Sequence, residues 1–257
     1  WNITDDSGNI IAEGNLPKFD IPSGNGITLG GIRYSLNKIK TPAMYTLTVS
    51  VGEFKNNWNI WVYPKNQDSI LTTEIKIVRS LDNDAIDFLK NGGKVLLSPV
   101  KGSIKIGKGG EVAVGFSSIF WNTAWTSKQP PHTLGILCNP KHPMLKEFPT
   151  QYHSNYQWWD AMTHSNAFLL NELGENIQPV VRIIDDWFTA RPLGLIIESR
   201  AGKGKLVLSG IDLLTEIEKR PEAKQLLNSI LKYMESSSFN PVQEIQIERI
   251  KELIAAP

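Results

Sequence analysis

The feature that most constrains this chain is a change of pattern at residues 64–69, a polar stretch that opens with a proline. Before it, apolar and polar residues alternate, as over residues 44–51, and this period of two is typical of strands with one buried face. After it, the chain shows helical spacing and short apolar runs. Two domains are also expected because 257 residues exceed the usual size of one domain. We place them at residues 1–66 and 67–238, followed by a C-terminal tail at 239–257.

The first domain is predicted to be an all-β immunoglobulin-like sandwich. Turn-forming clusters at residues 5–9 and 23–26 separate short strand-like segments, and no helical pattern interrupts them. Short strands with turn signals at close intervals are typical of this sandwich. Trp58 and Trp61 have two interpretations: stacking platforms for sugars, or packing in the sandwich and at the domain junction.

The second domain is predicted to be α/β. Asp82 can cap a helix that Gly92 and Gly93 end, and residues 94–99 follow as a short apolar strand. Two later strands around the turn at residues 202–204 are expected to form a hairpin, and a helix beginning at Pro221 has one apolar face. About 170 residues are too few for an eight-fold βα barrel of about 250. We therefore expect one doubly wound sheet, with an amphipathic helix in the tail.

Composition excludes several classes of function. A hydrophobic fraction of 41% and a charged fraction of 21% are ordinary for a globular chain. The net charge of +1 gives no electrostatic reason to bind nucleic acid, and no apolar run approaches the roughly 20 residues of a membrane span. The single cysteine, Cys138, excludes an internal disulfide without fixing the compartment. Because the sequence opens with Trp1 and no signal-peptide pattern, we interpret it as a mature or excised fragment.

We identify no complete catalytic apparatus in the sequence. Glycoside hydrolysis needs two carboxylates about 5 to 9.5 Å apart, and spacing alone brings no such pair together. The acidic residues considered are Asp160, Asp185, Asp186, Glu198 and Asp212. An amidotransferase needs a cysteine on a sharp strand-to-helix turn, and Cys138 lacks the small neighbours of such an elbow. We interpret it as a small hydrophobic residue at the end of a strand.

No metal site and no cofactor are predicted. Structural zinc sites use short pairs of ligands, and this spacing is absent among the four histidines, His132, His142, His153 and His164. A calcium site built from aspartates and carbonyl oxygens remains an open alternative. The glycine-containing loops lack the spacing of a nucleotide cradle and are interpreted as turns.

Carbohydrate contact is the activity that the residues favour most. Aromatic rings offer apolar faces to sugar C–H groups, and nearby amides fix the hydroxyls. The alternative is that this aromatic band joins the two domains, or joins them to another domain. The candidate carbohydrate-binding residues are Trp121, Asn122, Trp125, His153, Gln157, Trp158 and Trp159.

Four segments give the chain a family resemblance: NNWNIWVYP at 56–64, FPTQYHSNYQWW at 148–159, VRIIDD at 181–186 and GKGKL at 202–206. In these segments it resembles the C-terminal region of bacterial glycoside hydrolase family 2 proteins, the multi-domain β-galactosidase and β-glucuronidase-like enzymes of gut Bacteroidetes. The resemblance implies a sandwich, then a flavodoxin-like domain similar to class I glutamine amidotransferases. The hydrolytic carboxylates would sit upstream on a barrel. The segment after the final strand, residues 210–213, lacks the His-Pro-Glu of active amidotransferases.

The function expected from this resemblance is that of a non-catalytic accessory portion of a glycoside hydrolase. It would brace the upstream catalytic barrel of the same polypeptide, line part of the substrate cleft, and reside in the periplasm, in secreted form or at the cell surface. The alternatives are a carbohydrate-binding module for an oligo- or polysaccharide, and an amidotransferase-like enzyme that uses Cys138.

Overall fold

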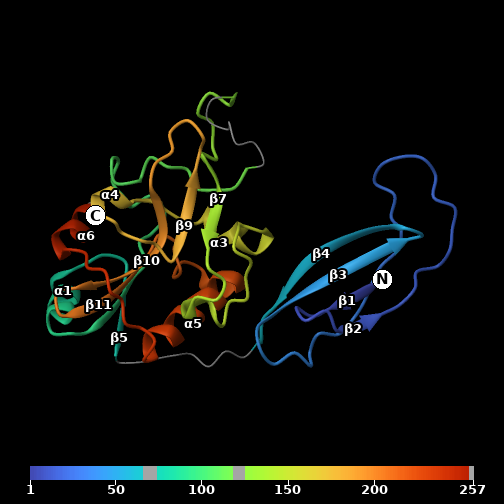
Figure 1. The fold of residues 1–257 in the computed structure, drawn as a ribbon, viewed down its shortest axis with the longest axis horizontal. Helices are drawn as coiled ribbons and strands as arrows, with labels where there is room; N and C mark the ends of the chain where they lie inside the picture. Colours follow the sequence, from blue (N-terminus) through green and yellow to red (C-terminus); the bar gives the residue numbers. More distant parts are fainter. Residues whose placement is uncertain (66–73, 118–124, 255–257) are drawn as a thin grey trace. The chain divides into compact units, whose positions relative to one another are not determined.

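The structure is a computed structural model that describes residues 1–65, 74–117 and 125–254. The chain divides into two compact units, Trp1–Gln67 and Asp68–Pro257 (Figure 1). None of the helices within the described ranges combines the length and the apolar character that crossing a bilayer requires.

The first unit is one four-stranded antiparallel sheet with the order β2-β1-β3-β4. Its strands are β1 (Asn2–Thr4), β2 (Ile10–Glu13), β3 (Ala43–Val51) and β4 (Phe54–Val62). The β3–β4 hairpin closes where Val51 pairs with Phe54, and Gly52 supplies the positive φ of 59° that the tight turn needs.

The predicted immunoglobulin-like sandwich is wrong, because residues 1–65 contain this one sheet and no second sheet facing it. The alternation over β3 and β4 indicated a half-buried face correctly, but it carries no information about how many layers cover that face. The structure also has no strand within residues 27–36. Of the hydrophobic side chains in residues 1–65, only Ile3 is buried.

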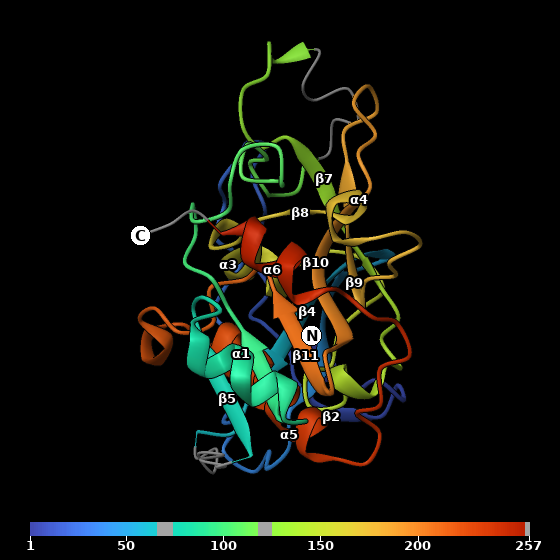
Figure 2. The same ribbon diagram turned by 90° about the vertical axis from the view of Figure 1, so that its left-hand side faces the viewer.

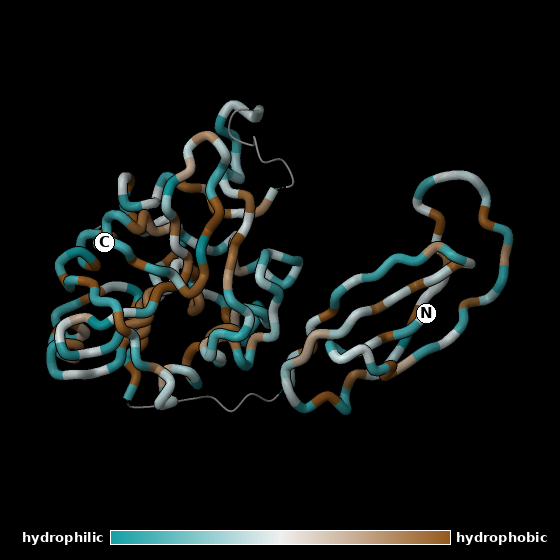
Figure 3. The backbone as a smooth tube through the Cα atoms, viewed as in Figure 1, coloured by the Kyte–Doolittle hydropathy of each residue, from teal (hydrophilic) through white to brown (hydrophobic). Residues whose placement is uncertain are grey.

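The second unit contains a mixed sheet of seven strands. Six of them follow the order β5-β6-β11-β10-β9-β7, and the seventh, β8, pairs with β10. Its strands are β5 (Ile75–Val78), β6 (Lys94–Leu97), β7 (Thr133–Cys138), β8 (Phe168–Leu169), β9 (Val181–Asp185), β10 (Leu193–Ala201) and β11 (Gly204–Ser209). Apolar residues follow its central strands (Figure 3). The helices are α1 (Asn83–Lys90), η1 (Pro143–Leu145), η2 (Tyr156–Trp158), α3 (Trp159–Thr163), α4 (Leu170–Leu173), η3 (Ile217–Lys219), α5 (Pro221–Glu235) and α6 (Ile247–Leu253).

The flavodoxin-like, doubly wound prediction for this unit is wrong as well. The pairs β5–β6 and β6–β11 are parallel. The pairs β11–β10, β10–β9 and β9–β7 are antiparallel. The reason lies in the connections: short turns join β9 to β10 and β10 to β11, and short turns can join only antiparallel strands. The hairpin predicted around residues 202–204 is confirmed, because Ala201 pairs with Gly204.

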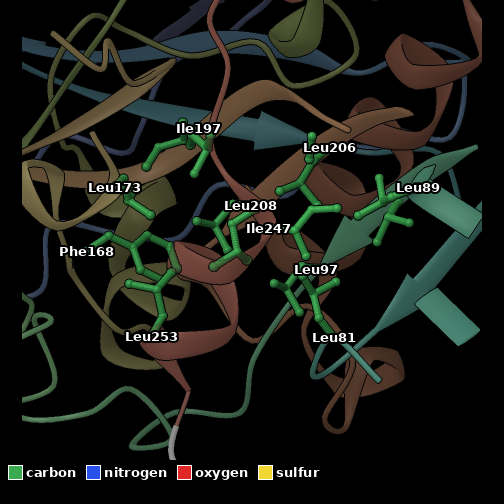
Figure 4. Close-up of a cluster of buried hydrophobic side chains, with 14 of the residues drawn as sticks. Leu81, Leu89, Leu97, Phe168, Leu173, Ile197, Leu206, Leu208, Ile247 and Leu253 are labelled. Carbon is green, nitrogen blue, oxygen red and sulfur yellow. The ribbon is translucent and has the colours of Figure 1, made fainter. Parts of the chain in front are cut away.

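Helices cover both faces of the parallel half of the sheet (Figure 2). On one face, Leu89 of α1 and Ile247 of α6 pack with Leu97 and Leu208 of the strands in one buried cluster (Figure 4). The side chain of Leu96 points to the opposite face and is fully buried too. The amphipathic helix predicted in the tail is therefore present as α6, and its apolar side chains are part of the core.

Local signals that define α1 are confirmed by the structure. The side chain of Asp82 accepts a hydrogen bond of 2.8 Å from the backbone N–H of Ala85. After the helix ends at Lys90, Gly92 adopts a φ of 91°, and the strand β6 follows. Helix, glycine turn and buried strand thus form the single α/β unit that the sequence predicted.

Candidate functional site

Strands β9 and β7 present side chains that remain partly exposed. Leu137 pairs with Arg182 across these strands and Gly135 pairs with Ile184, so Leu137, Arg182 and Ile184 lie on one face. Leu137 is 47% exposed, and Arg182 and Ile184 are half-buried. Two open hollows meet at Arg182 on this part of the unit, with volumes of about 450 Å³ and about 760 Å³. We call the two hollows together the β9 trough.

The smaller hollow lies beside the turn that joins β9 to β10. Leu134 and Ile184 supply its apolar wall, and Trp187 stands at the turn with 67% of its surface exposed. The carboxylate of Asp186 accepts hydrogen bonds from the backbone N–H groups of Phe188 and Thr189, at 2.8 and 3.0 Å. These bonds fix the turn, which places an aromatic ring at the rim of the hollow.

A partly buried ion pair closes the base of the same turn. The carboxylate of Asp185 accepts hydrogen bonds from the Nε and Nη2 of Arg191, at 2.7 and 2.9 Å. The hydrogen bond to Asp185 raises the pKa of the Arg191 guanidinium. The two charged groups therefore neutralise each other, and their role in the trough is to hold the turn in place.

The larger hollow lies where β7 ends and β9 begins, and its rim is held by paired amides. The backbone N–H of Gln178 donates to Oε1 of Gln243 at 2.9 Å, and Nε2 of Gln243 donates to the carbonyl of Gln178 at 2.9 Å. Gln243 Nε2 also donates to the carbonyl of Glu198 at 2.6 Å. The hollow thus has fixed amide groups beside the apolar side chains of Val180 and Val242.

A carboxylate, a phenol and an imidazole meet at the inner side of this hollow. The hydroxyl of Tyr233 donates to Oε2 of Glu198 at 2.6 Å, and burial raises the pKa of Tyr233 above its usual value. The ring of His142 contacts the Tyr233 ring at 5.6 Å, and burial lowers the pKa of His142. His142 is therefore neutral at pH 7, with Nδ1 accepting from the backbone N–H of Met144.

Cys138 also lines the larger hollow but is not activated. Its Sγ donates to the carbonyl of Gln151 at 3.4 Å, and burial raises the pKa of its thiol to about 11. Nucleophilic cysteines have lowered pKa values, because the thiolate is the reactive form.

We expect the folded chain to be alkylated by iodoacetamide at pH 7 at least about 100-fold more slowly than the same chain unfolded in urea, because the thiolate is scarce and the sulfur is buried. Mass spectrometry measures both rates on the single cysteine, Cys138. Equal rates in the folded and unfolded chain would contradict the geometry described here.

Two of the predicted carbohydrate-binding residues are buried. Trp158 is 0% exposed: its Nε1 donates to Oγ1 of Thr150 at 2.7 Å, and its ring packs against Phe148 at 5.2 Å. Gln157 is 2% exposed, and its Nε2 donates to the carbonyl of Pro149 at 2.9 Å. The structure corrects the prediction for both residues, because a ring or amide without exposed surface cannot contact a glycan from solvent.

The three other predicted residues that lie within the described ranges are exposed. Trp159 is 53% exposed on α3 and packs edge-on against Phe116, whereas His153 forms an isolated bridge with Leu137 beside β7. Trp125 is 68% exposed and precedes β7. Because Thr133 pairs with Asp185, the start of β7 lies at the same end of the sheet as the turn that carries Trp187. Trp121 and Asn122 lie outside the described residues.

Sequence reasoning did not select Arg182, Gln178 or Gln243 of the β9 trough as candidate binding residues. A signal was present in the strand VRII at 181–184, where Arg182 stands between two residues that are buried in the structure, Val181 and Ile183. In a strand such a position points away from its neighbours, toward the opposite face. Gln178 and Gln243 gave no signal, because their pairing joins segments far apart in the sequence.

A metal centre is not apparent in the part of the chain that the structure describes. Within residues 1–65, 74–117 and 125–254, no three His, Cys, Asp or Glu side chains gather as metal ligands would.

The fold and the trough define a two-unit chain: an antiparallel sheet, then a mixed α/β unit with an open polar and apolar surface. Residues 76–255 match the family model described as Domain of unknown function (DUF8487). Because this match spans more than half of the chain, the chain belongs to that family. Residues 1–64 match the model described as Domain of unknown function (DUF8488). No curated protein matches the chain.

Proposed function

We propose that this chain is a non-catalytic accessory portion of a glycoside hydrolase and that it contacts the glycan through the β9 trough. The observation that carries the proposal is the lining of the trough. Trp187 and Leu137 offer exposed apolar surface, and the paired amides of Gln178 and Gln243 stand in fixed positions beside it. Sugars have apolar C–H faces and a rim of hydroxyls, so this combination suits them.

The bonding of the acidic side chains supports an accessory role. Asp160 is paired with Arg220 at 2.8 Å, Asp185 with Arg191 at 2.7 Å, and Glu198 accepts from Tyr233 at 2.6 Å. The carboxylates of a hydrolase must instead face the scissile bond from both sides. These three acids hold elements together, which favours a hydrolytic centre in another part of the polypeptide.

The resemblance noted in the sequence points to the same parent. The segment at 181–186, one of those that carry it, forms β9 and the first residue of its turn, which are the floor and one end of the trough. We therefore propose an upstream catalytic barrel as the partner, and a periplasmic, secreted or cell-surface location. An amidotransferase that uses Cys138 is disfavoured by the raised pKa of the thiol.

A second candidate function, bracing of that barrel, is favoured by the first unit. In its sheet, Leu47 is opposite Trp58, and Tyr45 is opposite Ile60, so these side chains form one apolar face. Trp58 is 50% exposed. Most domains bury such a face against a second layer. We propose that the barrel of the same polypeptide supplies that layer.

A pair of tryptophan variants tests glycan contact. Trp187→Ala should weaken binding of a β-linked oligosaccharide about tenfold, because it removes the exposed ring at the trough, a loss of about 1.4 kcal/mol. Trp159→Ala removes a ring that is 53% exposed and lines neither hollow, so it should leave binding unchanged. Isothermal titration calorimetry with galactose-based and glucuronic acid-based oligosaccharides measures both.

Two outcomes would contradict the proposal. One is the absence of binding to any β-linked oligosaccharide, or equal binding by the Trp187→Ala variant and the unmodified chain. The other is hydrolysis of an aryl glycoside by this chain alone, abolished by neutralising one of its own carboxylates.

A further inference from the structure

Arg182 occupies the centre of the β9 trough, because it is the residue that lines both hollows. Its neighbour on β7 is Leu137 and its neighbour on β10 is Gly194, so neither adjacent strand places a charged side chain beside it. The residues that pair directly with Arg182 in the sheet are thus uncharged.

The charge of Arg182 lacks a balancing carboxylate within the described ranges. Arg79, Arg191 and Arg220 of the same unit each pair with an aspartate at 3.3 Å or less. Arg182 instead donates from Nη2 to the neutral amide oxygen of Gln178 at 3.4 Å, which is long for a hydrogen bond. Because a guanidinium has five N–H donors in a fixed fork, most of its donors remain available to a ligand.

We infer that the ligand of the β9 trough is a glycan that carries a carboxylate, such as one containing a uronic acid, and that Arg182 binds this carboxylate. The inference rests on the proposed function. A carboxylate can accept two parallel hydrogen bonds from one guanidinium, and such charge-assisted pairs are the strongest hydrogen bonds in proteins.

Other groups in the larger hollow favour a sugar acid over a small free anion. Glu198 lines the same hollow as Arg182, and its Oε2 accepts from Tyr233, so a small anion at Arg182 would meet the repulsion of this carboxylate without any further contact to offset it. A sugar acid presents hydroxyls as well, which can donate to Glu198 and bond to the amides of Gln178 and Gln243. The exposed ring of Trp187 at the other hollow can stack on the next sugar.

The test compares an acidic oligosaccharide of β-linked glucuronic acid with its carboxyl-reduced, neutral counterpart. In calorimetry at low salt, the unmodified chain should bind the acidic form about tenfold more tightly, and salt should reduce this preference. Arg182→Gln should abolish the preference while retaining the binding of the neutral form. Arg182→Lys should keep part of it, because lysine keeps the charge and loses the fork.

Arg249→Gln is the matched control. Arg249 lies on α6, away from the hollows, and donates to a backbone carbonyl, that of Glu172. Its replacement removes the same charge and should leave the preference intact. Thermal unfolding of each variant verifies that it folds.

Equal binding of both oligosaccharides by the unmodified chain, or a preference that survives in Arg182→Gln, would overturn this inference alone, provided that binding still depends on Trp187. Absence of binding to either oligosaccharide would overturn the proposed function together with it.

Discussion

Replacing Trp158 with alanine should lower the free energy of unfolding of the chain by about 3–5 kcal/mol, the usual cost of truncating a buried aromatic residue. The indole is 0% exposed and packs against Phe148 with a ring separation of 5.2 Å. Its loss leaves a cavity and also removes the donor that bonds Oγ1 of Thr150 at 2.7 Å. Urea unfolding followed by circular dichroism measures the change.

The adjacent tryptophan provides the control for this experiment. Trp159 is 53% exposed, so its replacement by alanine should change the free energy of unfolding by less than about 1 kcal/mol. Equal losses in both variants would mean that the burial described for Trp158 is incorrect. The comparison also bears on binding studies. If the Trp158→Ala variant failed to bind glycan, the cause would be a disrupted core and not the loss of a contact with the sugar.

The pair of tryptophans shows what the sequence could not resolve. Both rings have the chemistry of a sugar platform, and consecutive positions at the start of α3 point in different directions. Which ring enters the core depends on Phe148 and Thr150, whose positions follow from the tertiary fold. The residue types therefore could not separate a ring in the core from a ring on the surface.

Features that depend on neighbouring residues were predictable. The cap at Asp82, the helix beginning at Pro221 and the hairpin between Ala201 and Gly204 all follow from local backbone chemistry, and all are present. The number of sheet layers and the direction of non-local strand pairs were not predictable. They depend on which strands meet across long loops, as when β7 pairs with β9, and alternation in one strand does not specify its partner.

The same division applies to the β9 trough. Arg182 could have been selected as a charged residue inside an apolar strand, but its lack of a carboxylate partner is a property of the folded unit. Asp185 and Asp186, by contrast, were considered as catalytic acids because of their charge. In the structure one binds Arg191 and the other caps the turn, so their local hydrogen bonds explain them.

Replacing Arg220 with alanine should also be strongly destabilising, by about 3–5 kcal/mol, because it breaks a buried ion pair on one side only. The residue is 7% exposed. Its Nε donates to both carboxylate oxygens of Asp160, at 3.0 and 2.9 Å, and its Nη2 lies 2.8 Å from the same carboxylate as an ion-pair contact. Its Nη1 donates to the carbonyl of Asp212 at 2.6 Å. The substitution leaves a carboxylate and a buried carbonyl without their donor, and it disconnects α3 from the segment that follows β11.

The surface pair formed by Lys219 and Glu216 is the control, since its side chains are 76% and 62% exposed. Lys219→Ala removes a positive charge from the adjacent position and should cost less than about 1 kcal/mol, because exposed pairs contribute little. Urea unfolding of both variants at the same ionic strength makes the comparison. A loss for Arg220→Ala no larger than that for Lys219→Ala would show that Asp160 is solvated without its partner. In that case Asp160 would again be a candidate acid of this unit, rather than a carboxylate that serves structure.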